Sequence, residues 1–193
     1  MKKTTRAERQ PNYVAFLRGI NVGGHKSVPM PRLKKAFEAL RFENVQTLLA
    51  SGNVLFGGRK ANPASLARKI EDKLRKAFHF EIGVIVRTIE KIRNLAAMEP
   101  FQGITVTPQT RLYVTFLSEK PKSSLQIPYQ SADGNFRILR ASSTEVCSVL
   151  KLSPDHSTVD LMAVLEKEFG KKVTTRNWNT IARILAQHPK GHK

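Results

Sequence analysis

Residues 13–24 read Tyr-Val-Ala-Phe-Leu-Arg-Gly-Ile-Asn-Val-Gly-Gly, and they predict the first elements of the fold. The first five residues are apolar and include valine, tyrosine and phenylalanine, so they predict a central strand of a sheet. The glycines that follow, at positions 19, 23 and 24, interrupt this strand and predict a loop. Apolar residues then recur with helical spacing, which predicts a helix from about Pro31 and involves Leu33, Ala36, Phe37 and Leu40.

Four further elements complete the first half of the chain. Residues 45–50 and 54–56 are short apolar runs on either side of Ser51-Gly-Asn53, which is a hairpin signal. A helix is predicted over residues 63–78, where apolar residues recur at every fourth position: Leu66, Ile70, Leu74 and Phe78. Residues 82–86 predict a fourth strand. The resulting order, β-α-β-β-α-β, is the split unit of the ferredoxin-like fold.

The second half of the chain repeats this order in a weaker form. Apolar runs predict strands at residues 112–117, 136–139 and 145–150, and a short strand is expected to follow at residues 172–174. Residues 122–131 are flanked by prolines and predict a poor helix or a loop, whereas residues 161–169 carry helical spacing. The repeat concerns the order of elements, because we find no residue-level match between the halves in the sequence.

These elements together predict an α+β protein of two tandem ferredoxin-like halves, each of βαββαβ type with an antiparallel sheet. The first half covers residues 13–100 and includes a connecting helix, and the second half covers residues 101–187. Residues 175–187 carry apolar side chains at helical spacing and predict an additional C-terminal helix. Residues 1–12 are expected to form a disordered basic arm and residues 188–193 a disordered tail.

The charge of the chain is strongly positive, because 33 lysines and arginines oppose 15 acids and give a formal net charge of +18. Such a field attracts nucleic acid, acidic membranes or phosphorylated small molecules, and it also serves solubility. Basic residues crowd between positions 59 and 76, and we expect most of them on the solvated side of the second helix. The third expected strand carries a single aromatic residue, Phe56, which argues against the RNA-binding mode in which two aromatic side chains stack on bases.

Three features restrict the expected cellular setting. Cys147 is the single cysteine, so the chain cannot form an internal disulfide, and it fits a reducing cytoplasm. The longest apolar runs are far shorter than the roughly 20 residues of a membrane-spanning helix. The N-terminal residues lack the apolar stretch of a secretory signal. We therefore expect a cytoplasmic protein without a membrane partner.

The expected topology brings two polar segments together. In a β-α-β-β-α-β unit, strands one and two run parallel with strand three between them. The loop after strand one and the hairpin between strands two and three therefore share one end of the sheet. Glycine lets backbone amides approach a ligand, and a following helix N-terminus favours anions. We predict an anion-binding site at this end, formed by Arg18, Asn21, Gly23, Gly24, Ser51 and Asn53, with turn formation as the alternative role.

A second polar cluster lies at residues 174–180, which read Thr-Thr-Arg-Asn-Trp-Asn-Thr. Thr174 or Thr175 is expected to cap the last helix. Its exposed first turn would then offer further anion contacts, from Arg176, Asn177 and Asn179. These residues can join the glycine-rich site only if the last helix folds back to the same end.

Patterns for catalysis and metal binding are weak. The five histidines do not occur at metal-ligand spacing, and we predict no metal and no cofactor. The sequence contains neither a P-loop nor a nucleophile-elbow pattern. Catalytic residues stay unassigned, and enzymatic activity is an open question at this point.

Several of these segments together resemble the DUF1697 family, a bacterial domain family of unknown function. The resemblance is carried by residues 13–24, Val28-Pro-Met30, Ala50-Ser-Gly-Asn-Val-Leu-Phe56, Val86-Arg-Thr88 and residues 174–180. It extends from about residue 13 to residue 186, and it implies a two-part α+β architecture. It implies almost nothing about activity. The basic N-terminal residues, the C-terminal Lys190-Gly-His-Lys193 and the strong positive charge depart from the family pattern.

Three functions remain open from the sequence. The first is binding of a phosphorylated or otherwise anionic small molecule at the glycine-rich end, with affinity that depends sharply on one or two side chains. The second is nucleic-acid binding through diffuse positive charge, with affinity that falls steeply with salt. The third is a structural or regulatory protein–protein module. We favour the first, and the sequence does not specify an oligomeric state.

Overall fold

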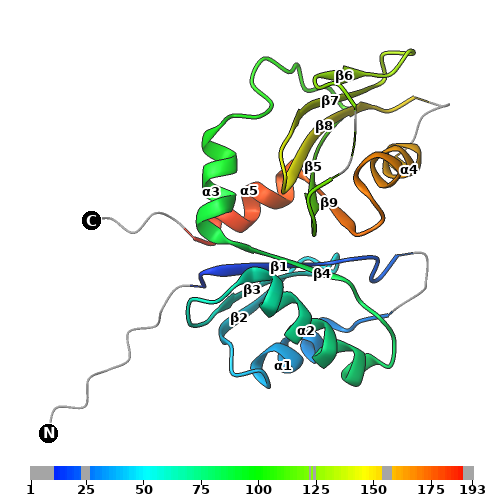
Figure 1. The fold of residues 1–193 in the computed structure, drawn as a ribbon. Helices are drawn as coiled ribbons and strands as arrows, with labels where there is room; N and C mark the ends of the chain where they lie inside the picture. The colour runs from blue at the N-terminus through cyan, green and yellow to red at the C-terminus, as the bar shows by residue number, and fades with distance from the viewer. Residues whose placement is uncertain (1–10, 23–26, 122, 124, 154–157, 189–193) are drawn as a thin grey trace, which may run out of the picture. The chain divides into compact units, whose positions relative to one another are not determined.

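The computed structural model describes residues 11–22, 27–121, 123, 125–153 and 158–188 (Figure 1). The chain divides into two compact units. The first unit contains the residues up to Ile92 together with those from Ile184 onward, and the second unit contains Arg93–Arg183. The two boundaries fall inside helices α3 (Ile89–Ala97) and α5 (Trp178–Ala186). Within the described part of the chain, no helix is both long and apolar enough to span a membrane.

The first unit contains a four-stranded antiparallel sheet with two helices on one face (Figure 1). The strands lie in the order β2-β3-β1-β4, and each pairs with its neighbour in antiparallel register. Along the chain the elements are β1 (Tyr13–Leu17), α1 (Met30–Glu38), β2 (Glu43–Leu48), β3 (Asn53–Gly57), α2 (Pro63–Phe78) and β4 (Val84–Thr88). The order of these six elements is the one expected for this half, although β4 begins two residues later than the sequence indicates.

Alternation along β1 explains how this sheet is buried. Tyr13, Ala15 and Leu17 contribute to the hydrophobic core beneath the two helices, together with Phe37 of α1 and Ile70 of α2. The intervening residues of β1 are buried as well, at no more than 1% exposure. A strand that is buried on both faces requires an uninterrupted apolar sequence, which this strand has.

The second unit contains a five-stranded antiparallel sheet in the order β6-β7-β8-β5-β9. Its elements are β5 (Thr110–Leu117), β6 (Tyr129–Gln130), β7 (Phe136–Ala141), β8 (Glu145–Lys151), α4 (Thr158–Phe169) and β9 (Val173–Asn177). The described residues of 122–131 form no helix and contain the short strand β6, which fits the loop alternative. Prolines at 121 and 128 remove two backbone donors that a helix there would use.

The two sheets share a residue-level repeat, contrary to our reading of the sequence. Strand β1 reads Tyr-Val-Ala-Phe-Leu, and strand β5 contains Tyr-Val-Thr-Phe-Leu from Tyr113 to Leu117. The strand register confirms that β1 and β5 are equivalent. Tyr13 pairs with Thr88, the last residue of β4, and Tyr113 pairs with Asn177, the last residue of β9. The connections between matching elements differ in length, so a search at one fixed spacing misses the repeat.

The last strand of each sheet extends the repeat. β4 reads Val-Ile-Val-Arg-Thr and β9 reads Val-Thr-Thr-Arg-Asn, and a nine-residue helix follows each without a loop. Both arginines are buried, and in each the Nη1 donates to the carbonyl oxygen of the preceding residue, at 3.0 Å for Arg87 and 2.8 Å for Arg176. Both units therefore end their sheets with the same strand-to-helix corner.

Candidate binding cavity

The glycine-rich loop and the β2–β3 hairpin do share one end of the first sheet. The backbone N–H of Leu17 donates to the carbonyl oxygen of Gly52 at 2.8 Å, and that of Arg18 donates to Gly83 at 2.8 Å. Gly52 has a φ of +78°, and a Cβ there would lie 2.8 Å from Cδ1 of Ile20. The topological prediction is confirmed, and glycine at position 52 is required both by conformation and by space.

The asparagines at this end hold the backbone together. Asn21 donates from Nδ2 to the carbonyl oxygens of Ala50 at 2.8 Å and Val28 at 3.1 Å, and its Oδ1 accepts from the N–H of Val28 at 2.8 Å. The fully buried Asn53 donates to the carbonyl oxygen of Leu48 at 3.0 Å and to Oγ of Ser51 at 3.1 Å. These hydrogen bonds give polar backbone groups at this end of the sheet their partners, so Asn21 and Asn53 have a structural role.

The remaining predicted residues of this end divide into two groups. Arg18 is half-buried, and its aliphatic stem runs beside Gly83. Gly23 and Gly24 lie outside the described residues. Ligand binding by Arg18 and its neighbours stays a prediction.

The second predicted cluster belongs to the second unit. Arg176 is 8% exposed, and its Nη1 donates to Oγ1 of Thr174 and the carbonyl oxygen of Thr175, each at 2.8 Å. Burial lowers the pKa of Arg176 to about 10, which leaves the guanidinium charged at neutral pH. Asn177 precedes α5, and its Oδ1 accepts from the N–H of Asn179 at 2.9 Å.

Asn177 is therefore the cap of α5. The expected caps, Thr174 and Thr175, lie inside β9 instead. The polar residues of this segment extend the strand because β5 offers them a full set of backbone partners. Arg18, Asn21, Ser51 and Asn53 belong to the first unit and Arg176, Asn177 and Asn179 to the second, so a shared site stays a prediction.

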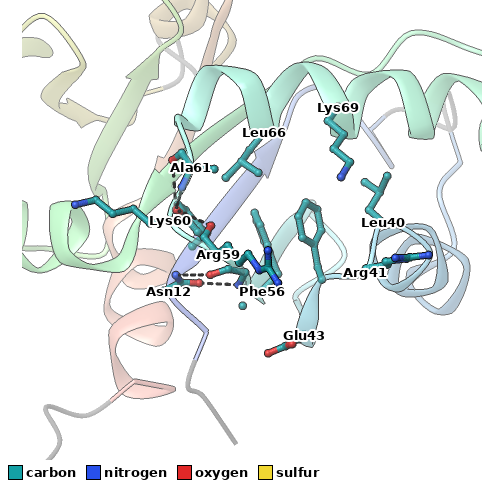
Figure 2. A pocket seen from close by; sticks show the side chains of 14 residues that line it. Asn12, Leu40, Arg41, Glu43, Phe56, Arg59, Lys60, Ala61, Leu66 and Lys69 are labelled. Atoms are coloured by element: carbon teal, nitrogen blue, oxygen red, sulfur yellow. Dashed lines mark hydrogen bonds between the residues drawn. The ribbon is translucent and has the colours of Figure 1, made fainter.

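A cavity of about 1190 Å³ lies at the opposite end of the first sheet (Figure 2). Its lining comes from four separated segments: residues 12–13 at the start of β1, residues 40–43 up to the first residue of β2, residues 56–61 from the end of β3 into the following loop, and the first half of α2. This cavity was not predicted from the sequence. One signal was present, because Gly57-Gly-Arg-Lys60 follows a strand and precedes the Asn62-Pro63 helix start.

Aromatic side chains form one part of the cavity lining. The rings of Tyr13 and Phe56 are stacked with centroids 5.4 Å apart, and the ring of Phe42 lies 4.4 Å from that of Phe56. Tyr13 and Phe56 are buried, whereas Phe42 is half-buried. Phe37 packs edge-on against Phe56 from α1 and supports the group. We call Tyr13, Phe42 and Phe56 the aromatic floor.

Four basic residues also line the cavity. Arg41, Arg59, Lys60 and Lys69 line the cavity, and Glu43 is the one acid among the described lining residues. Arg41, Arg59 and Lys60 are exposed and form no ion pair within the part of the chain that the structure describes. Lys69 extends from α2, with Nζ 5.8 Å from the Phe42 ring centroid (Figure 2). The expectation that most bases near this helix face solvent is confirmed, and three of these exposed bases (Arg59, Lys60 and Lys69) also line the cavity.

Two residues at the start of the sheet fix the loop that carries Arg59 and Lys60. Asn12 donates from Nδ2 to the carbonyl oxygen of Gly58 and accepts at Oδ1 from its N–H, both at 3.0 Å. The hydroxyl of Tyr13 accepts from the N–H of Ala61 at 2.9 Å. The loop is held on both sides of its two basic residues, which reduces the entropy lost when they bind a ligand.

Candidate metal ligands and the single cysteine can be located among the described residues. No three His, Cys, Asp or Glu side chains of the described segments gather closely enough to hold a metal ion. Cys147 is buried, and burial together with nearby Glu145 raises its pKa to about 12. Its thiol is therefore protonated at neutral pH.

Comparison with known proteins gives a fold and a family. The structure matches the conserved bacterial protein SP0830 from Streptococcus pneumoniae with a TM-score of 0.67 and 21% sequence identity, covering 93% of this chain and 99% of that one. At this identity the likeness shows the fold alone. A comparison with curated proteins gives no match. The model of the family described as "Protein of unknown function (DUF1697)" matches residues 11–146, and the chain therefore belongs to the DUF1697 family.

Proposed function

We propose that this protein binds a small anionic compound, such as a phosphorylated small molecule, in the cavity of the first unit. The observation that carries the proposal is the excess of basic residues around the cavity, because its lining, among the described residues, contains four basic residues and a single acid. Arginine and lysine bind phosphate and carboxylate groups through charge-assisted hydrogen bonds. A concave site concentrates this charge on one small ligand.

The fixed loop favours a compact ligand site over a diffuse charged surface. Asn12 and Tyr13 hold the loop around Arg59 before any ligand arrives. Preorganised charge of this kind makes affinity depend on individual side chains. A nucleic acid on a diffuse basic surface would instead tolerate single substitutions and lose affinity steeply with salt.

We also infer that the two units are ferredoxin-like halves related by duplication. The sheet order β2-β3-β1-β4, with α1 and α2 on one face, supports this for the first unit. The second unit supports it less completely, because described residues between β5 and β7 form β6 where the first unit has a helix. The Tyr-Val-x-Phe-Leu repeat in β1 and β5 supports a common origin.

The proposal is tested by calorimetric titration of inorganic pyrophosphate at fixed ionic strength. Arg59→Ala removes a charge from the cavity, and Arg68→Ala removes an exposed charge of α2 that does not line it. We expect Arg59→Ala to weaken binding by roughly tenfold or more, since hydrogen bonds to charged groups contribute about 1.5–3 kcal/mol. Arg68→Ala should change affinity less than twofold in about 0.15 M salt, because distant exposed charges are screened.

A third variant distinguishes the two ends of the sheet. Arg18→Ala should leave pyrophosphate binding unchanged if the cavity is the site. A loss caused by Arg18→Ala and not by Arg59→Ala would place binding at the glycine-rich end. Equal, small losses for all three variants, with a steep salt dependence, would indicate diffuse polyanion binding instead.

A further inference from the structure

We propose that the ligand of this cavity carries an aromatic ring next to its anionic group, as an aryl phosphate or a nucleotide does. The inference rests on the proposed function and specifies the chemical class of its ligand. It is drawn from the aromatic floor, from the position of Lys69 above that floor, and from the size of the cavity.

The aromatic floor matches a ring better than it matches an inorganic anion. Phe42 is half-buried over Phe56, and Leu40 and Leu66 also line the cavity. A hydrated inorganic anion gains no binding free energy from contact with an apolar surface. A planar ring gains by covering it, because aromatic pairs add specific stacking to the burial of apolar area.

Lys69 places a positive charge directly above this floor. Its Nζ lies 5.8 Å from the centroid of Phe42, and the side chain is exposed. Contacts between a cation and an exposed ring are weak, so an anionic ligand can draw the ammonium group away from the ring. One ligand with a ring and a neighbouring anionic group can then stack on Phe42 and form an ion pair with Lys69.

The size of the cavity supports the same ligand class. A lone phosphate occupies a small part of about 1190 Å³ and leaves the half-buried ring of Phe42 in contact with water. Cavities for drug-sized ligands have about 300–1,000 Å³. An aryl phosphate or a nucleotide therefore fits within this one and covers its floor.

The test compares phenyl phosphate with methyl phosphate by calorimetry, at one ionic strength and at a pH where both are dianions. We expect wild-type protein to bind phenyl phosphate about tenfold more tightly. Phe42→Leu keeps apolar bulk but removes the ring, and should reduce the preference for phenyl phosphate over methyl phosphate to about twofold. Phe80→Leu is the matched control, because Phe80 is also half-buried but does not line the cavity, and it should keep the full preference.

The outcomes separate this inference from the proposed function. Equal, Arg59-dependent binding of the two esters would overturn the ring inference and leave anion binding intact. A preference that survives in Phe42→Leu would also overturn it, because the ring would bind elsewhere. Absence of binding by either ester and by pyrophosphate would refute the proposed function itself. The ester comparison uses wild-type protein and does not depend on the folding of any variant.

Discussion

The side-chain amide of Asn12 forms two hydrogen bonds with the backbone of Gly58, one in each direction and both 3.0 Å long. Asn12 precedes the first strand, and Gly58 begins the loop between β3 and α2. This pair joins two segments that are 46 residues apart, and it places Arg59 and Lys60 at the mouth of the cavity.

Removal of the Asn12 amide should loosen this loop. We expect Asn12→Ala to lower the free energy of unfolding by about 1–2 kcal/mol, since each hydrogen bond contributes about 0.5–1.5 kcal/mol and the site is exposed. Pyrophosphate affinity should fall although no charge is lost, because the loop must then be ordered on binding. Urea unfolding and calorimetry measure the two effects, and an unchanged affinity would show that the loop position does not matter for binding.

Gly52 is predicted to be far less tolerant of a side chain than Gly19. Both have positive φ, but a Cβ at position 52 would lie within 3.0 Å of Ile20 and Leu17, whereas one at position 19 meets nothing within 4 Å. We expect Gly52→Ala to destabilise by about 2–4 kcal/mol through strain and overpacking. Gly19→Ala should cost about 1 kcal/mol from backbone strain alone. Similar unfolding midpoints for the two variants would contradict this distinction.

Asn53→Ala should act on stability and leave the chemistry of a ligand site untouched. The substitution removes both donors that the fully buried side chain gives to Leu48 and Ser51. We expect a loss of about 1–3 kcal/mol in the free energy of unfolding, because two hydrogen bonds of about 0.5–1.5 kcal/mol each are removed. Thermal unfolding measures this loss, with Arg18→Ala as the comparison at the same end. A ligand defect in a fully stable Asn53→Ala protein would favour the site predicted from the sequence.

The thiol of Cys147 should make stability depend on pH in the alkaline range. Its pKa is about 12 in the folded state, against 9.0 for the unperturbed group. The unfolded chain therefore loses this proton first, and stability falls as pH rises from about 9 to about 12. At pH 10, urea unfolding should show wild-type protein losing about 1 kcal/mol more than Cys147→Ala, relative to pH 8. Rapid alkylation of the folded protein by iodoacetamide at pH 8 would contradict the raised pKa.

Strong local signals explain which elements the sequence predicted well. Helix α2 has the predicted bounds because the Asn62 side chain accepts from the N–H of Ala64 at 2.8 Å, Pro63 follows it, and His79 ends the helix with a φ of 66°. The start of β4 was misplaced because Ile82 is apolar but fills the core ahead of the strand. Burial by itself does not identify a strand.

Long-range packing explains what the sequence left out. The polar residues Thr175, Arg176 and Asn177 belong to a strand because β5 pairs with them. The cavity was missed because its lining converges from four segments, and spacing along the chain says nothing about such convergence. The topological prediction for the glycine-rich end succeeded because strand pairing alone determines which loops share an end.

The division of the chain has a consequence for synthesis on the ribosome. The second unit is one continuous run, Arg93–Arg183, whereas the first unit also includes the residues from Ile184 onward, and Ile184 itself is buried. Since chains emerge N-terminus first, the unit whose synthesis begins first acquires this segment only after the whole second unit has been made. A nonsense mutation at codon 184 would thus leave the second unit whole and the earlier-made one incomplete.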